Sequence, residues 1–194
     1  MLLNNQLPSF ALEAVRKVAP FDEAAWALLR AVMVPRRLAK NDFLVQPGQP
    51  CRHIYLVQHG LLRSFHLKEG DERNVAFAPE NTFLTDLKSL RTGQPTGLFM
   101  QALEPSTVWG IAKTDLMERY QQSHQVESFG RNLLESMLEK QEEYTSWFTL
   151  YSAKERYERL VQQQPALVQR LSLGHLASYL GVRRETLSRL RARA

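Results

Sequence analysis

The sequence lacks any long apolar run and any recognisable export signal. Although 44% of its 194 residues are hydrophobic, no stretch approaches the roughly 20 consecutive apolar residues that a membrane-spanning helix needs. Residues 1–20 contain no basic segment followed by an apolar block and a small-residue cleavage site, which is the pattern of a secretory signal. We therefore expect a cytoplasmic protein with no membrane partner.

The sequence is equally poor in the residues that most cofactor and catalytic sites require. Its single cysteine, Cys51, cannot form an internal disulfide and is too few for a structural zinc or iron–sulfur site, so we expect a buried thiol. His53, His59 and His66 have no spaced carboxylate or cysteine partner and are interpreted as strand residues, not metal ligands. A glycine-rich phosphate loop and a nucleophile spaced from a base are also missing. We predict no catalytic residue, metal or cofactor, and no enzyme activity.

Positive charge is concentrated at one end of the chain. Residues 1–151 contain 16 Lys and Arg against 17 Asp and Glu, a net charge of −1, whereas residues 152–194 contain 9 against 3, a net charge of +6. The overall charge of +5 therefore comes entirely from the last 43 residues. A small basic segment joined to a larger near-neutral one indicates contact with a polyanion, although a solvated charged face remains the alternative.

The first two thirds of the chain predict helices followed by strands. Residues 10–33 have a helical pattern, with Asp22 as a plausible N-cap. From Leu38 to Ile111, short apolar runs alternate with Gly and Pro, which favours strands joined by turns in an antiparallel barrel or roll. The best strand candidates are Ile54–Val57, Leu61–Leu67, Val75–Phe77, Leu98–Leu103 and Thr107–Ile111.

A short helix capped by Thr114 and then a long helix, starting at Val126 or Ser128 and ending near Tyr151, are predicted next. One face of the long helix is apolar, with Leu134 and Leu138 at its margin. The face is wide enough to contact both the roll and a symmetry mate in coiled-coil fashion, unless it serves only its own domain, as the interruption by Lys140 and Gln141 allows. The apolar face is made by Phe129, Leu133, Met137, Tyr144, Trp147, Phe148 and Tyr151.

The last 22 residues, from Leu173, match a helix-turn-helix pattern. After a helix over residues 153–164 that Pro165 ends, a first helix places Ala177 where a second helix must cross closely, and Gly181 supplies the positive φ of a tight turn. Val182 anchors the turn. The buried side of this hairpin is predicted to be Leu176, Ala177, Leu180, Leu187 and Leu190.

The opposite side of the second helix is suited to a DNA groove. Arg184, Glu185, Ser188 and Arg189 share one face, and these side-chain types can bond guanine, cytosine and mixed base or phosphate atoms. Arg183, Thr186, Arg191 and Arg193 flank that face and suit phosphates. A plain surface hairpin remains the alternative.

With these residues, the sequence resembles the family of the cyclic-AMP receptor protein and the fumarate–nitrate reduction regulator. The resemblance is carried by Gly48, Gly60 and Gly70 at turns of the roll, the helix Glu155–Pro165, the Arg184-Glu185-Thr186 and later Arg189 pattern, and the Glu185, Ser188, Arg189 arrangement. It implies an α+β fold with three parts: a cyclic-nucleotide-binding-type antiparallel β-roll sensor over residues 1–127, a dimerisation helix over 128–151, and a helix-turn-helix domain over 152–194.

The same resemblance implies function. A homodimer would bind palindromic double-stranded DNA whose half-sites contain a TGA element, with RNA polymerase as a further partner. The family's hairpin wing has little room, since only residues 166–171 separate Pro165 from Ser172.

The ligand pocket departs from the family pattern. The family's Phe-Gly-Glu-Leu segment aligns with Phe83 to Leu87, where Thr85 replaces glycine and Asp86 shortens the ribose-binding glutamate. Ten residues after Asp86, Thr96 stands where the phosphate-binding arginine belongs, and a threonine hydroxyl cannot replace a bidentate cation. The alternative is that Arg91, which lies nearby in the sequence, turns inward to replace that arginine. Cyclic AMP binding is not expected, and the roll binds another small molecule or none.

Two functions follow from the residues. The first is a transcription regulator of this type. The alternative is a ligand-sensing roll that relays to a protein partner and ends in a vestigial helical hairpin.

Overall fold

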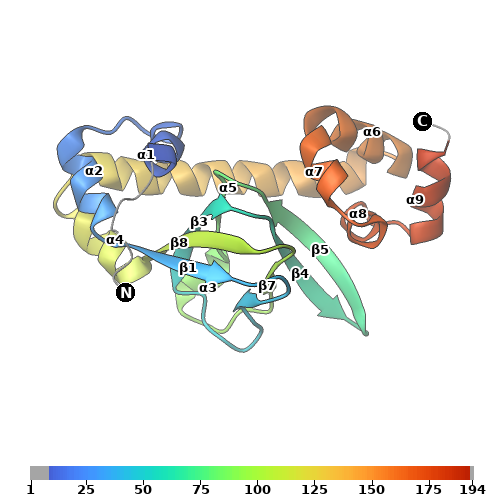
Figure 1. Ribbon diagram of the computed structural model, residues 1–194, viewed down its shortest axis with the longest axis horizontal. Helices are drawn as coiled ribbons and strands as arrows, with labels where there is room; N and C mark the ends of the chain where they lie inside the picture. The colour runs from blue at the N-terminus through green and yellow to red at the C-terminus, as the bar shows by residue number, and fades with distance from the viewer. Residues whose placement is uncertain (1–8, 193–194) are drawn as a thin grey trace.

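The computed structural model describes residues 9–192 and has an α+β architecture, as the sequence predicts. Helix α5 (His124–Leu150) runs along most of the long axis of the molecule, with a β-roll beneath it and four further helices at its C-terminal end (Figure 1). The short helices that precede the roll lie at the opposite end of α5 (Figure 1). The chain is thus organised as a roll, a connecting helix and a C-terminal helical unit.

The roll consists of two four-stranded antiparallel sheets, in the orders β1-β8-β3-β6 and β2-β7-β4-β5. Strand β3 shows how the first sheet is buried on both faces: Tyr55 and Val57 point into the roll, whereas Ile54 and Leu56 point outward into a second core formed with helices. Between the sheets lies a cluster of twelve buried apolar residues. The strands are β1 (Met33–Leu38), β2 (Phe43–Val45), β3 (His53–His59), β4 (Leu62–Lys68), β5 (Asp71–Ala78), β6 (Phe83–Leu84), β7 (Phe99–Ala102) and β8 (Ser106–Ala112).

The five strand candidates correspond to β3, β4, β5, β7 and β8, whereas β1, β2 and β6 were not among them. Strand β1 is hard to recognise because only its end residues, Met33 and Leu38, are buried, and Pro35, Arg36 and Arg37 between them are exposed. It pairs only with β8 and so forms a sheet edge, where a proline is tolerated because no second partner needs its missing amide. Strands β2 and β6 contain only three and two residues.

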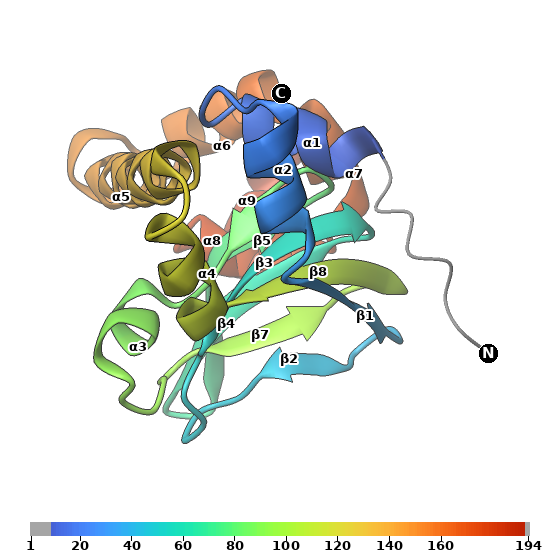
Figure 2. The same ribbon diagram turned by 90° about the vertical axis from the view of Figure 1, so that its left-hand side faces the viewer.

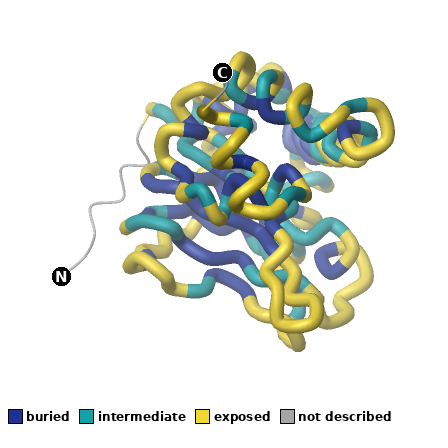
Figure 3. Tube along the Cα trace, turned by 90° about the vertical axis from the view of Figure 1, so that its right-hand side faces the viewer, coloured by how far each residue is buried: buried dark blue, intermediate teal, exposed yellow. Residues whose placement is uncertain are grey.

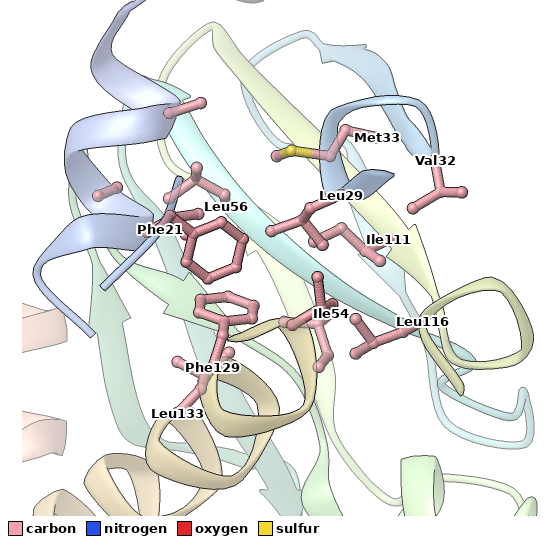
Figure 4. Close-up of a cluster of buried hydrophobic side chains, with 14 of the residues drawn as sticks. Phe21, Leu29, Val32, Met33, Ile54, Leu56, Ile111, Leu116, Phe129 and Leu133 are labelled. Carbon is pink, nitrogen blue, oxygen red and sulfur yellow. The ribbon is translucent and has the colours of Figure 1, made fainter. Parts of the chain in front are cut away.

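Four helices pack around the first sheet. Figure 2 shows α1 (Ser9–Arg16) and α2 (Glu23–Arg30) over β3 and β8. The shared core is drawn in Figure 4, where Phe21 meets the ring of Phe129 edge-on at 5.8 Å. The predicted N-cap of α2 is confirmed, since the Asp22 carboxylate accepts a hydrogen bond from the amide of Ala25 at 2.8 Å. This core fixes the N-terminal half of α5 against the roll.

The starts of two helices differ from the predictions. Thr114 does not cap α4 (Lys113–Tyr120), because the helix already begins at Lys113 and its N-cap residue, Ala112, makes no side-chain cap. Helix α5 begins at His124, before either predicted start, because the Ser123 hydroxyl accepts from the amide of Val126. In both cases the sequence contains several polar residues in a row, and only the structure shows which of them leaves the helix.

The apolar face of α5 is shared between the two ends of the molecule. Phe129 and Leu133 belong to the core against the roll, and Trp147 belongs to the core of the C-terminal unit. Four large apolar side chains of α5 remain exposed in this single chain: Leu134 at 38%, Leu138 at 57%, Phe148 at 42% and Leu150 at 66%. The first three lie on one side of the helix. The contact with the roll is therefore present, and an apolar strip is left over.

The C-terminal unit contains four helices around one apolar cluster. Figure 3 views the molecule from this end and shows exposed stretches of these helices alternating with buried ones. The segment in which the family places its wing is occupied by a short helix instead, which begins at Pro165 in the favourable first position. The helices are α6 (Ala153–Gln163), α7 (Pro165–Arg170), α8 (Leu173–Tyr179) and α9 (Arg184–Arg191).

Candidate nucleic-acid interface

Helices α8 and α9 form a tight helical hairpin whose turn is built as the sequence predicts. The Ser172 hydroxyl caps α8 by accepting from the amide of His175 at 3.1 Å. Gly181 has φ +67°, the left-handed conformation that glycine adopts at least cost. The chain then reverses, and the amide of Val182 donates to the carbonyl of Ala177 at 3.0 Å. Ala177 is buried in this crossing, which is consistent with the need for a small side chain there.

The predicted buried side of the hairpin is confirmed with one exception. Leu176, Leu180 and Leu187 are almost fully buried in the C-terminal cluster. Leu190 is only partly exposed rather than buried, because it lies near the end of α9, where less of the unit covers it. The apolar side of the hairpin is therefore packed into the C-terminal cluster, and the polar side of α9 takes no part in that packing.

Seven of the predicted DNA-contacting side chains lie within the described residues, and all seven are exposed, whereas Arg193 lies outside the described residues. Within residues 9–192, none of them forms a side-chain hydrogen bond or an ion pair with another residue. Arg183, the N-cap residue of α9, makes no side-chain cap, so the amides of the first turn can donate to an outside acceptor such as a phosphate. The seven residues are Arg183, Arg184, Glu185, Thr186, Ser188, Arg189 and Arg191.

The position of α9 also leaves this face accessible. Figure 1 shows α9 at the outer end of the molecule, farther from the roll than α8. Four arginines and one glutamate lie within nine residues, which gives the surface a strong positive potential together with one acceptor. Such a surface attracts phosphates by charge, and its arginines can also form bidentate bonds to guanine edges.

Three of the four residues aligned with the family's ligand pocket, Thr85, Asp86 and Thr96, are engaged in local hydrogen bonds. Asp86 is the N-cap of α3 (Leu87–Thr92): one carboxylate oxygen accepts from the amides of Lys88 and Ser89 at 3.0 and 3.1 Å, and the other accepts from the Thr96 hydroxyl. Thr85 donates its hydroxyl proton to the carbonyl of His53 at 2.8 Å. Both oxygens of the Asp86 carboxylate are thus already engaged.

Arg91 does not turn into the roll, because it is exposed on α3. The space between the sheets is filled instead by apolar side chains, including Tyr55, Leu62 and Met100. A phosphate inside the roll would need a cation to offset its desolvation, and the described residues place none there. Cys51 is buried beside this interior, as expected.

Arg63 is the one charged side chain that is buried among the described residues, and it was not among the residues predicted to be functional. Since its neighbour Leu62 points inward, Arg63 lies on the outer face of the second sheet. Its guanidinium donates to the Gln101 side chain at 2.9 and 2.6 Å and to the Glu72 carboxylate at 3.0 Å. This hydrogen bond with Arg63 lowers the pKa of Glu72. The sequence signal that could have identified this buried network is the presence of an arginine within the largely apolar stretch from Leu61 to Phe65.

Other potential sites are weaker. A cavity of about 310 Å³ opens between α3, the chain just before β3 and the junction of β8 with α4, with Arg52 and Lys113 among its residues. Within the described part of the chain, no three His, Cys, Asp or Glu residues gather in a way that could hold a metal ion. No helix between residues 9 and 192 is long and apolar enough to cross a membrane.

Comparison with protein families matches residues 35–123 to the cyclic nucleotide-binding domain. Among curated proteins, patatin-like phospholipase domain-containing protein 6 of Mus musculus and of Homo sapiens is 41% identical over 64 residues, which is 31% of this chain. The match spans about 5% of the length of those two relatives, so it concerns one module of much larger proteins.

Solved structures resemble the chain over most of its length. FixK2 of Bradyrhizobium japonicum has a TM-score of 0.74 at 19% identity, covering 84% of each chain. The c-di-GMP responsive regulator CLP of Xanthomonas campestris has a TM-score of 0.67 at 16% identity, covering 89% of this chain and 91% of its own. A protein of Eubacterium rectale assigned to the CRP/FNR family of transcriptional regulators has a TM-score of 0.67 at 16% identity, covering 88% and 82%. Residues 35–123 therefore match the cyclic nucleotide-binding domain, and the chain has the same fold as these solved structures over most of its length.

Proposed function

We propose that this chain is a homodimeric transcription regulator that binds palindromic DNA through α9. The observation that carries the proposal is the polar face of α9, where seven side chains including four arginines are exposed and have no partner among the described residues. Arginines left without an internal anion are available for an external one, and DNA provides both phosphates and guanine edges. The regulator-like fold supports the same function.

The dimer is proposed to form along α5. Leu134, Leu138 and Phe148 are exposed in the single chain, and with Gln141 and Thr145 they occupy positions spaced alternately by four and three residues, the repeat of a coiled-coil seam. Met137 lies outside this seam, because it packs against the core of the roll. A variant that tests the dimer should therefore change Leu138 rather than Met137.

Two-fold symmetry sets the operator. Two copies of α9 must enter major grooves about one helical turn apart, roughly 34 Å, so half-sites should repeat at about 10–11 base pairs or a multiple of that spacing. Arg184, Glu185, Ser188 and Arg189 are assigned to bases, and Arg183, Thr186 and Arg191 to phosphates. A role on chromosomal DNA places the protein in the cytoplasm with RNA polymerase as a further partner.

The roll is proposed to respond to something other than cyclic AMP, or to no small molecule. Asp86 is engaged by Thr96 and by the start of α3, and residues 9–192 place no cation inside the roll for a cyclic phosphate. Loss of a charge-assisted pair costs about 2–5 kcal/mol, or roughly 30-fold to several thousand-fold in affinity. Calorimetric titration with cyclic AMP and cyclic GMP should therefore show no micromolar binding, and heat of binding in that range would overturn this part of the proposal.

The alternative, a relay module with a vestigial hairpin, is disfavoured because a hairpin without a DNA partner has no use for an exposed basic face of this kind. Selection from a random duplex pool by the wild-type protein separates the two functions. A palindromic consensus supports the regulator. If the protein recovers only random sequences, and only at low salt, its DNA binding is non-specific electrostatic attraction. That result would overturn the proposal that α9 reads a base sequence.

A further inference from the structure

The first helix of the hairpin is attached to an exposed edge of the roll. Strand β5 is the last strand of its sheet, so its outer amides and carbonyls lack a strand partner. Ser178 of α8 supplies one: its hydroxyl accepts from the amide of Asn74 at 3.0 Å and donates to the carbonyl of Glu72 at 2.6 Å. One serine side chain thus replaces a neighbouring strand at this point.

Two more contacts surround the same point on β5. The side-chain amide of Asn74 donates to the carbonyl of His175 in α8 at 3.3 Å. The hydroxyl of Tyr144 in α5 lies within hydrogen-bond distance of the carbonyls of Asn74 and Tyr179, at 3.1 and 3.0 Å. A register irregularity between Ser64 and Phe65 in the pairing with β4 marks a bulge beside Asn74, and bulges commonly re-aim backbone groups in this way.

A second attachment lies at the end of α7. The guanidinium of Arg170 holds the carboxylate of Glu80 through two hydrogen bonds, at 2.8 and 3.0 Å, and also contacts Glu104. Glu80 follows β5 and Glu104 follows β7, so one arginine joins two turns of the roll to the DNA-binding unit. The Arg170 side chain is 29% exposed, and a partly buried bidentate pair fixes geometry better than a surface pair.

The surface between these two attachments is apolar. Leu61 is fully buried in the same cluster as Leu176 and Leu187 of the hairpin, and Phe77 packs against that cluster with its ring edge-on to Tyr179 at 5.1 Å. Polar contacts at both sides of an apolar patch define one docked orientation, because hydrogen bonds and ion pairs tolerate little sliding.

We propose that Ser178 and Arg170 are positioning residues that hold the DNA-reading hairpin in a single orientation on the roll. The inference rests on the proposed DNA-binding function and deepens it. A dimer that reads two half-sites must place two copies of α9 at one spacing, and an orientation fixed before binding removes the ordering cost that a loosely tethered hairpin would incur. The attachment therefore sets how strictly the protein requires one half-site spacing, while base contacts set which bases it reads.

Arg170→Gln and Ser178→Ala are the test variants, each with a matched control. Arg73→Gln changes the same charge on β5, where Arg73 is 54% exposed and pairs only with nearby Asp71. Ser136→Ala removes a hydroxyl that bonds only to its own helix. Arg170→Gln is the more informative variant, because Arg170 does not itself contact Asn74.

The first measurement needs no DNA. Hydrogen exchange at the Asn74 amide, which donates to Ser178, reports whether α8 stays on β5. We expect Arg170→Gln to speed this exchange about tenfold or more, as an opening of the whole attachment requires, and Arg73→Gln to leave it unchanged. Unchanged exchange in Arg170→Gln would show that the two contacts do not act together and would overturn the proposal, whatever the protein binds.

The second measurement uses duplexes with one half-site, with two half-sites at the selected spacing, and with one base pair inserted between them. We expect Arg170→Gln and Ser178→Ala to bind the single half-site as the wild type does, to lose about tenfold in affinity for the full site, and to discriminate less against the insertion. Tighter full-site binding would mean that the attachment is inhibitory and would overturn the positioning role. If the wild type selects no palindrome, the proposed function fails, while the exchange result still decides whether the attachment exists.

Discussion

Arg63 and Arg189 show the same side chain in opposite situations. Arg63 is buried on the outer face of the roll and donates to Gln101, Glu72 and Asn74. Arg189 is exposed on α9 and has no side-chain partner among the described residues. A guanidinium whose donors are satisfied inside the fold is committed to structure, whereas one without an internal acceptor can take an external anion. Arg170 is an intermediate case. Its partners, Glu80 and Glu104, belong to the same chain, but they lie in the roll whereas Arg170 lies in the C-terminal unit.

The same contrast separates two leucines of α5, and it gives the largest expected effect. Leu133 is buried against the roll, whereas Leu138 is 57% exposed on the proposed dimer seam. Leu138→Glu would bury an unpaired carboxylate from each subunit, and we expect it to weaken the dimer by about 3–5 kcal/mol, at least about 100-fold. Light scattering at micromolar concentration should then report a monomer, with loss of full-site DNA binding.

Leu67→Glu is the matched control for that substitution, because Leu67 is 56% exposed on β4 rather than on α5. It should remain dimeric. A wild-type protein that is already monomeric at micromolar concentration would contradict the seam.

Removing the satisfied arginine should affect folding rather than DNA reading. Arg63→Ala leaves the buried Gln101 and the Glu72 carboxylate without their charged donor, and we expect the free energy of unfolding to fall by about 2–3 kcal/mol. Urea denaturation measures this loss. Arg73→Ala, at an exposed position of the adjacent strand, should change stability by less than about 0.5 kcal/mol. Equal effects of the two substitutions would mean that the Arg63 network contributes nothing specific.

The contrast also explains which features were predictable from sequence. Gly181, Ala177 and the polar face of α9 follow from local periodicity and turn chemistry, so the hairpin could be placed residue by residue. The fold class and five strands followed from alternation between apolar runs and turns. Strand β1, by contrast, is defined by its pairing with β8, and a stretch containing Pro35, Arg36 and Arg37 carries no local signal of that pairing.

Long-range polar contacts could not be predicted from the sequence for a similar reason. Ser178 and Asn74 are 104 residues apart in sequence, and Arg170 and Glu80 are 90 residues apart, so no local pattern relates them. The residues aligned with the family's ligand pocket were predictable only in part. A threonine at position 96, where the resemblance predicts an arginine, was visible in the sequence, but the use of Asp86 as a helix cap was not.

Removing the unsatisfied arginine should have the reverse effect of Arg63→Ala. Arg189→Ala is expected to leave urea stability unchanged, to weaken binding of the selected palindrome by about 1–3 kcal/mol, and to relax the preference at one base of each half-site. Arg191→Ala is the matched control: it should weaken all duplexes alike and reduce the dependence of log affinity on log salt by about 1. Selection and binding at two salt concentrations separate the two. If Arg189→Ala leaves the selected motif intact, Arg189 does not read a base.

The smallest expected effect concerns His175, which is neither fully buried like Arg63 nor exposed like Arg189. It belongs to α8 and is half-buried, and the groups that face it from the roll are Arg63 of β4 and Glu72 of β5. Burial is the main cause that lowers the pKa of His175 below its ordinary value of 6.5; Arg63 lowers it further, and Glu72 partly opposes this. The neutral imidazole is therefore favoured when α8 is docked.

A histidine whose pKa is lower in the docked state than when exposed binds a proton more readily once released. Its contribution to docking is thus fully present above pH 6.5, and it is lost as the pH falls through that value. We expect hydrogen exchange at the Asn74 amide, corrected for the intrinsic pH dependence of exchange, to become modestly faster between pH 7.5 and 5.5. His175→Gln should remove this change while retaining a polar side chain of similar size, whereas His53→Gln, which removes another histidine with a lowered pKa from the far side of the roll, should retain it. Identical pH dependence in wild type and His175→Gln would show that His175 does not influence the attachment, and the contrast between satisfied and unsatisfied groups would then rest on the arginines alone.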